Sequence, residues 1–176
     1  MPQARDHKAV FLVGFMGAGK TSVGRSLGRR LGWSFEDLDD RVQASAGRSI
    51  VEIFRDSGEA EFRRLENAAL QAVLRELSSG PRVVALGGGA FAQPENVALL
   101  ENEGVAVVFL DGQVEELFHR CQQEHRERPL LRDAKQFREL YEQRRPSYLK
   151  VACQVDTTGK DVDQVVAEVA CRIGLQ

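Results

Sequence analysis

Apolar and polar positions along the chain alternate between short strands and amphipathic helices. Short apolar runs predict strands at 9–13, 83–86, 105–110 and 151–155, and segment 36–40 is expected to be a strand that ends in acidic residues. Between the strands, apolar residues recur at helical spacing. Strands that alternate with helices favour parallel pairing. The pattern therefore predicts an α/β fold: a three-layer sandwich with a five-stranded, mainly parallel sheet and helices on both faces.

Helix-breaking residues divide the helical pattern. Two short helices are expected within 41–58 and a longer one at 59–77. A later helix, 134–145, is expected to end before Pro146, because proline has no backbone N–H to donate. The highly charged stretch 122–133 lies between two helical patterns and predicts a mobile lid.

Composition narrows the class of protein. With 176 residues and 43% hydrophobic content, 1–176 is predicted to form one domain, with the polar residues 1–8 flexible. A net charge of −2 gives no reason to expect nucleic acid or an acidic membrane as a partner. The chain shows neither a signal peptide nor an apolar run long enough to span a bilayer, so we expect a cytoplasmic protein. Three cysteines without zinc-ligand spacing disfavour a disulfide framework or a zinc site.

One motif stands directly after the first predicted strand. Residues 14–21, Gly-Phe-Met-Gly-Ala-Gly-Lys-Thr, have the spacing G-x-x-x-x-G-K-[ST] of a phosphate loop. Such a loop aims backbone N–H groups at phosphate oxygens, while its lysine neutralises the β and γ phosphates and its hydroxyl ligates Mg²⁺. The motif predicts ATP binding by Gly17, Ala18, Gly19, Lys20, Thr21 and Ser22.

Two aspartates compete as the partner of Thr21 in holding magnesium. Asp111 ends an apolar run, as a typical second NTPase motif does, and pattern alone slightly favours it over Asp37. Asp37 and Asp39 have the alternate spacing that places two carboxylates on one side of an extended segment. The triple glycine Gly87–Gly89 either permits an unusual turn or lets a ligand approach the backbone.

Taken together in order, the motifs resemble those of shikimate kinase over nearly the whole chain. The resemblance rests on the phosphate loop followed by Val23-Gly24-Arg25, on Asp37-Leu38-Asp39, Glu61-Phe62-Arg63-Arg64-Leu65-Glu66 and Gly87-Gly88-Gly89, and on Arg128-Pro129-Leu130-Leu131 and Arg144-Arg145-Pro146-x-Tyr148. It implies transfer of the ATP γ-phosphoryl group to the 3-hydroxyl of shikimate, in aromatic amino-acid biosynthesis.

The resemblance also implies roles for particular residues. Asp37 matches a residue that helps to hold Mg²⁺ with Thr21, which outweighs Asp111, and Lys20, Asp39 and Arg128 match catalytic positions. Arg63 and Arg144 match arginines that hold the shikimate carboxylate, and Gly87, Gly88 and Gly89 line the same subsite. The substrate-binding subregion is expected at roughly 36–66. Arg120 lies near the family's adenine-stacking arginine.

Elementary chemistry supports these assignments. A planar carboxylate is held well by guanidinium groups, and Glu66 stands three residues after Arg63, so it can orient that side chain. Asp39 is expected to position the acceptor first and to act as a base second, because a loose phosphoryl-transfer transition state needs little early deprotonation. The lid is expected to deliver Arg128 when the acceptor binds, so Arg128→Ala should lower kcat more than shikimate affinity.

Other readings remain open from the sequence. A gluconate kinase would share the loop and lid, and a nucleotide-binding regulator that lacks catalysis would share the loop. A GTPase would need an N-K-x-D motif, which the sequence lacks, and a helicase or motor ATPase would normally need a longer chain. Shikimate and ATP are the expected small-molecule partners, and a monomer is the expected state.

Overall fold

The computed structural model describes residues 7–124 and 133–175. Within these ranges, a five-stranded sheet has the order β2-β3-β1-β4-β5, and every pair of neighbouring strands is parallel. The prediction of a mainly parallel sheet is therefore confirmed. The strands are β1 (Ala9–Val13), β2 (Ser34–Asp37), β3 (Arg82–Ala85), β4 (Ala106–Asp111) and β5 (Cys153–Asp156).

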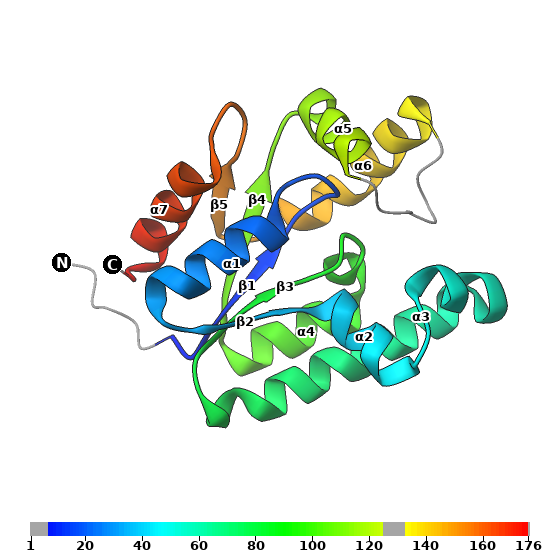
Figure 1. Ribbon diagram of the computed structural model, residues 1–176, viewed down its shortest axis with the longest axis horizontal. Coiled ribbons are helices and arrows are strands. Elements are labelled where there is room, and N and C mark those ends of the chain that lie inside the picture. The colour runs from blue at the N-terminus through cyan, green and yellow to red at the C-terminus, as the bar shows by residue number, and fades with distance from the viewer. Residues whose placement is uncertain (1–6, 125–132, 176) are drawn as a thin grey trace.

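Helices cover both faces of the sheet (Figure 1). Helices α1 and α7 pack together on one side, whereas α3 and α4 pack on the other. The described helices are α1 (Lys20–Leu31), α2 (Leu38–Ala46), α3 (Ile50–Arg75), α4 (Pro94–Glu103), α5 (Val114–Gln123), α6 (Ala134–Tyr148) and α7 (Val162–Ile173), with short 3₁₀ helices η1 (Glu76–Ser79) and η2 (Ala90–Ala92). None of the helices in the described ranges is long and apolar enough to cross a membrane.

The central position of β1 in the sheet explains why its residues form an uninterrupted apolar run. All five residues of β1 are buried, because helices cover both of its faces and strands pair with both of its edges. Its register aligns Val10 with Val83 of β3 and with Ala106 of β4. The carboxyl ends of β1, β2 and β3 therefore meet at one edge of the sheet, where ligands gather in parallel α/β folds.

The acidic segment after β2 is not the extended strand that its alternation predicted. Strand β2 ends at Asp37, and Asp39 lies in the first turn of α2. The reason is local capping: the Asp37 carboxylate accepts the Asp39 backbone N–H at 3.0 Å and so starts the helix. The spacing of two residues reflects an N-cap and its second helical residue, and not two side chains on one face of a strand.

One further boundary differs from the sequence pattern, and one agrees with it. Helix α6 continues through Pro146 to Tyr148, although Pro146 was expected to end it. A proline fits a helical φ angle, and the chain resumes helical bonding at once, since the Leu149 N–H donates to the Arg145 carbonyl. In α3, Gly58 has φ 81° and ψ 173° and interrupts the helix where the division between 41–58 and 59–77 was expected.

Candidate active site

The phosphate loop is shaped by glycines whose backbone conformations disfavour other residues. Gly17 has φ 80° and Gly19, the N-cap of α1, has φ 86°. A Cβ on Gly17 would also lie 2.4 Å from the carbonyl oxygen of Leu117. No side chain caps α1, so its first N–H groups and its positive end face the loop. The segment therefore has the geometry of an anion-binding turn.

The polar side chains of the loop are drawn inward. The Lys20 amino group donates to the carbonyls of Gly14 at 2.8 Å and Phe15 at 3.0 Å, which holds it over the loop. The Thr21 hydroxyl donates to Asp37 Oδ2 at 2.9 Å, while Oδ1 of the same carboxylate caps α2. Hydroxyl and carboxylate oxygens are the ligands that Mg²⁺ takes beside nucleotide phosphates, so this pair fits the ion.

Asp111, the alternative magnesium residue, is engaged elsewhere. Its Oδ2 accepts from Arg145 at 2.7 Å, and its Oδ1 accepts from the Gly112 N–H at 2.9 Å. The hydroxyl of Thr21 meets Asp37 and not Asp111. Pattern alone had slightly favoured Asp111, whereas the resemblance favoured Asp37, and the structure places the Asp37 carboxylate beside the phosphate loop.

Four charged side chains surround the triple glycine that follows β3. A Cβ on Gly87 would lie 2.6 Å from Asp39 Oδ1 and 3.3 Å from Glu66 Oε2, and one on Gly89 would lie 2.4 Å from an Arg63 guanidinium nitrogen. None of the three glycines has a φ in the left-handed region. The glycines therefore do not form an unusual turn, and the groups that crowd Gly87 and Gly89 are the protein's own side chains.

We call Asp39, Arg63, Glu66 and Arg144, gathered around Gly87–Gly89, the charge cluster. A Cβ on Gly88 would meet only ordinary contacts, with an Arg144 guanidinium nitrogen at 3.5 Å and Met16 Cγ of the phosphate loop at 3.6 Å. The charge cluster therefore adjoins the phosphate loop at the same edge of the sheet.

The two acids of the charge cluster hold their protons unusually tightly. Burial raises the pKa of Glu66 to about 7, against the opposing effect of Arg63, and the side chain is only 1% exposed. Burial and the neighbouring charge of Asp37 raise the pKa of Asp39 to about 6. Glu66 Oε2 and Asp39 Oδ1 are buried, and no described residue donates a hydrogen bond to either. Raised pKa values and unsatisfied buried oxygens are typical of a site that receives a ligand.

The two arginines of the cluster differ in how they are held. Arg63 donates to Glu66 at 2.9 Å and to Glu59 at 3.2 Å, which fixes its guanidinium as the spacing on α3 predicted. Arg144 is 9% exposed, and none of its nitrogens donates a hydrogen bond to another described residue. Burial, with the nearby charge of Arg63, lowers the pKa of Arg144. The guanidinium groups of Arg63 and Arg144 thus both lie beside the glycine loop, and each keeps N–H donors that no described residue accepts.

Arg120 lies beside the phosphate loop. Its guanidinium donates to the Gly17 carbonyl at 3.3 Å, to the Thr157 carbonyl at 3.2 Å, and to Glu116 on its own helix. Arg128 and most of the predicted lid, residues 125–132, lie outside the described residues.

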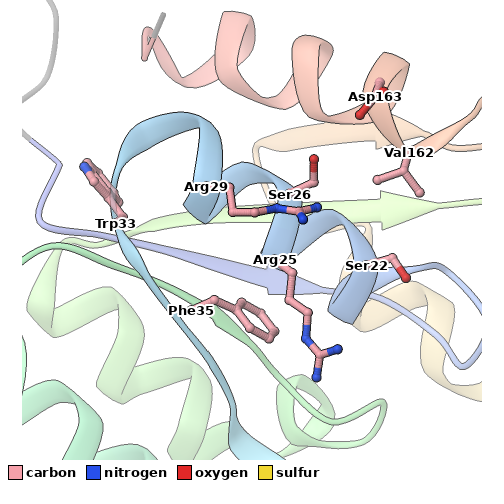
Figure 2. Close-up of a pocket in the computed structure, with 8 residues that line it drawn as sticks. All are labelled: Ser22, Arg25, Ser26, Arg29, Trp33, Phe35, Val162 and Asp163. Atoms are coloured by element: carbon pink, nitrogen blue, oxygen red, sulfur yellow. The ribbon is translucent and has the colours of Figure 1, made fainter.

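A surface groove of about 730 Å³ opens along α1, away from the charge cluster (Figure 2). Within it, the Arg25 guanidinium lies 5.8 Å from the centre of the Phe35 ring. The groove includes one predicted nucleotide residue, Ser22, and none of the charge cluster. It is lined by Ser22, Arg25, Ser26, Arg29, Trp33, Phe35, Val162 and Asp163.

Comparison with known proteins agrees with the motifs. The family model for shikimate kinase matches residues 16–173. The chain belongs to the shikimate kinase family. It is 45% identical to the shikimate kinase of Geobacter metallireducens, with 91% of this chain and 88% of the relative covered. It is 39% identical to that of Persephonella marina, with 93% and 98% covered.

Solved structures of shikimate kinases share the fold. The shikimate kinase of Acinetobacter baumannii in complex with shikimate superposes with a TM-score of 0.85 at 32% identity, covering 93% of this chain and 91% of that one. Membership of the shikimate kinase family confirms the family and fold predicted from the sequence. Family membership also decides against the gluconate kinase reading and carries the family's activity, a phosphoryl transfer in aromatic amino-acid biosynthesis.

Tyr148 belongs to a motif that carries the resemblance, but no role was predicted for it from the sequence. The Tyr148 hydroxyl donates to the Gly88 carbonyl, from a ring that is 1% exposed. Tyr148 stands four residues after Arg144, a spacing that places both side chains on one helix face. The expected end of the helix at Pro146 left Tyr148 outside the predicted helix, so this spacing was not used.

Proposed function

We propose that this protein transfers the γ-phosphoryl group of ATP to the 3-hydroxyl of shikimate, with the phosphate loop binding the donor and the charge cluster binding the acceptor. The observation that carries the proposal is the convergence of Asp39, Arg63 and Arg144 on Gly87–Gly89, next to Met16 of the phosphate loop. Two guanidinium groups suit the carboxylate of shikimate and a carboxylate suits its hydroxyls. Donor and acceptor sites thus adjoin.

The acceptor is held from two sides. Arg63, steadied by Glu66 and Glu59, and the buried Arg144 grip the carboxylate of shikimate. Asp39, at the far end of the glycine loop, accepts a hydrogen bond from the hydroxyl that reacts. Its raised pKa of about 6 still leaves it mostly ionised at pH 7, so it can take the hydroxyl proton as the new oxygen–phosphorus bond forms and the bond to ADP breaks.

The donor is held by groups that stabilise charge. The backbone N–H groups of the phosphate loop and the Lys20 amino group face the phosphates, and Arg120 lies at the adenine end. Thr21 and Asp37 are the residues that would hold Mg²⁺, which supplies positive charge at the β and γ phosphates when bound. We include Arg128 among the residues that hold ATP because of its sequence motif.

A coupled ADP-release assay with shikimate, with gluconate and without an acceptor tests this function. We expect turnover that requires shikimate, a low rate without an acceptor, and no stimulation by gluconate. ATP binding without acceptor-dependent turnover would contradict the proposal and would favour the regulatory reading.

A further inference from the structure

The three carbonyls of the glycine loop are all occupied, but not in the same way. The carbonyls of Gly87 and Gly89 accept the backbone N–H groups of Ala90 and Ala92 in η2, at 3.0 and 3.2 Å respectively. The carbonyl of Gly88 accepts the hydroxyl of Tyr148. No described residue accepts a hydrogen bond from the N–H groups of this loop. The Gln93 side chain also donates to the Gly89 carbonyl, at 3.4 Å, so Tyr148 is the partner of the middle carbonyl and the N–H groups of the loop are left available.

Tyr148 is itself held firmly in place. Its ring stacks on Phe109, with centres 5.2 Å apart, and on Phe91, with centres 6.4 Å apart. Burial raises the pKa of the hydroxyl to about 12, so it remains a donor at neutral pH. A side chain that is 1% exposed and packed against two rings has little freedom to move its hydroxyl. The Gly88 carbonyl therefore has a fixed partner.

Fixing that carbonyl also fixes a donor. The Gly88 carbonyl and the Gly89 N–H belong to one planar trans peptide, in which the two groups point in opposite directions. The Gly89 residue lies against the Arg63 guanidinium, and its neighbour Gly88 lies against Arg144. The N–H of Gly89 is thus a third donor beside the two cations of the charge cluster.

We propose that Tyr148 is a positioning residue: by holding the Gly88–Gly89 peptide plane, it aims the Gly89 N–H at the carboxylate of the acceptor. This inference rests on the proposed placement of shikimate against the glycine loop. A purely structural tyrosine would fill space between the rings, and loss of its hydroxyl would lower stability without a selective effect on one substrate.

The chain offers a matched control on the same helix. The Tyr141 hydroxyl donates to the Gly112 carbonyl at 3.1 Å, so Tyr141→Phe removes the same kind of bond at a position outside the charge cluster. We expect Tyr148→Phe to raise the shikimate KM about five- to tenfold, the effect of one lost hydrogen bond, with the ATP KM within about twofold. Tyr141→Phe should leave both constants within about twofold. An unchanged shikimate KM in a folded Tyr148→Phe protein would overturn the inference.

A second ligand tests whether Tyr148→Phe weakens shikimate binding at the carboxylate. The analogue of shikimate with its carboxylate reduced to a hydroxymethyl group lacks the anion that Gly89 would bind. Its inhibition constant should change less than about twofold between the wild type and Tyr148→Phe. A loss of affinity for the analogue as large as that for shikimate would contradict a role of Tyr148 in carboxylate binding.

Arg144→Ala separates this inference from the proposed function. If Arg144→Ala raises the shikimate KM and Tyr148→Phe does not, the positioning role fails and the placement of shikimate stands. If neither variant changes the shikimate KM, the placement itself fails.

Discussion

The phosphate loop and the charge cluster lie side by side at one edge of the sheet, and they are built in opposite ways. The loop is one continuous segment, 14–21, whose binding groups are mostly backbone N–H donors set by glycine conformations. The charge cluster takes its residues from α2, α3 and α6, around the loop after β3. Its binding groups are charged side chains, and burial raises the pKa values of Asp39 and Glu66 and lowers that of Arg144.

This difference indicates which kinds of substitution should impair each site. A phosphate loop tolerates changes elsewhere in the fold, because its geometry is local. The charge cluster depends on helix packing and on keeping unsatisfied charges buried, which costs stability until a ligand arrives. Variants should therefore separate the two regions by the substrate whose use they impair.

The largest expected effect is at the loop. Lys20→Ala should lower kcat by about 10²–10³-fold, because it removes a fixed cation from the phosphates that carry the developing charge. The shikimate KM should stay within about threefold, as measured by steady-state kinetics at saturating ATP. A comparable loss in shikimate binding would erase the distinction between the two regions.

The next largest effect is expected at Asp37, which lies between the phosphate loop and the charge cluster. Asp37→Asn should raise the Mg²⁺ concentration for half-maximal activity by about tenfold or more, because a ligand charge is lost. Asparagine still accepts the Asp39 N–H, so the start of α2 is kept.

Asp111→Asn is the matched control for that experiment. Asp111 pairs with Arg145 and not with Thr21, so its replacement should leave the Mg²⁺ requirement within about twofold. If Asp111→Asn instead produced the larger change, the metal assignment would be reversed.

A smaller effect is expected from the glycine loop. Gly89→Ala should raise the shikimate KM about tenfold, because its methyl group would lie 2.4 Å from an Arg63 nitrogen and displace the guanidinium. Gly88→Ala should weaken shikimate binding less, since its methyl group meets no protein atom closer than 3.5 Å. Kinetic comparison of the two variants, with thermal unfolding to check the fold, gives the order. The reverse order would mean that the substrate, and not Arg63, fills the tightest space.

The last expected effect is on stability and not on substrate use: a pH dependence of unfolding without substrates. The pKa of Glu66 rises from its usual 4.5 to about 7 in the folded protein, so the folded state binds this proton more tightly than the unfolded state. Its stabilising contribution is present below pH 4.5 and is lost as the pH rises through 7, by about 3 kcal/mol at most. Denaturant unfolding between pH 5 and pH 8 should show this fall in the wild type and a flatter profile in Glu66→Gln.

Glu61→Gln provides the control on the same helix. Glu61 is paired with Arg64 at the surface, and that pairing lowers its pKa, so it contributes nothing to the fall between pH 5 and pH 8. Parallel profiles for the wild type and Glu66→Gln would show that Glu66 is ionised in the folded protein throughout this range.

The sequence by itself determined the features that depend on short stretches of chain. Apolar β1, the glycine and lysine spacing of the phosphate loop, and the alternation of strands and helices were enough to predict the sheet and the nucleotide loop. The spacing of Arg63 and Glu66 likewise predicted their contact on α3, because residues three apart face each other on a helix.

Only the tertiary structure decided how distant segments meet. It placed Asp37 and not Asp111 beside Thr21, and it brought Tyr148 to the Gly88 carbonyl across a helix that continues past Pro146. It also set the raised pKa of Glu66, because burial depends on what packs over a side chain and not on its neighbours in sequence. Local hydrogen bonding can be read from residue patterns, whereas desolvation and convergence arise only when the packed fold removes water from the space between segments.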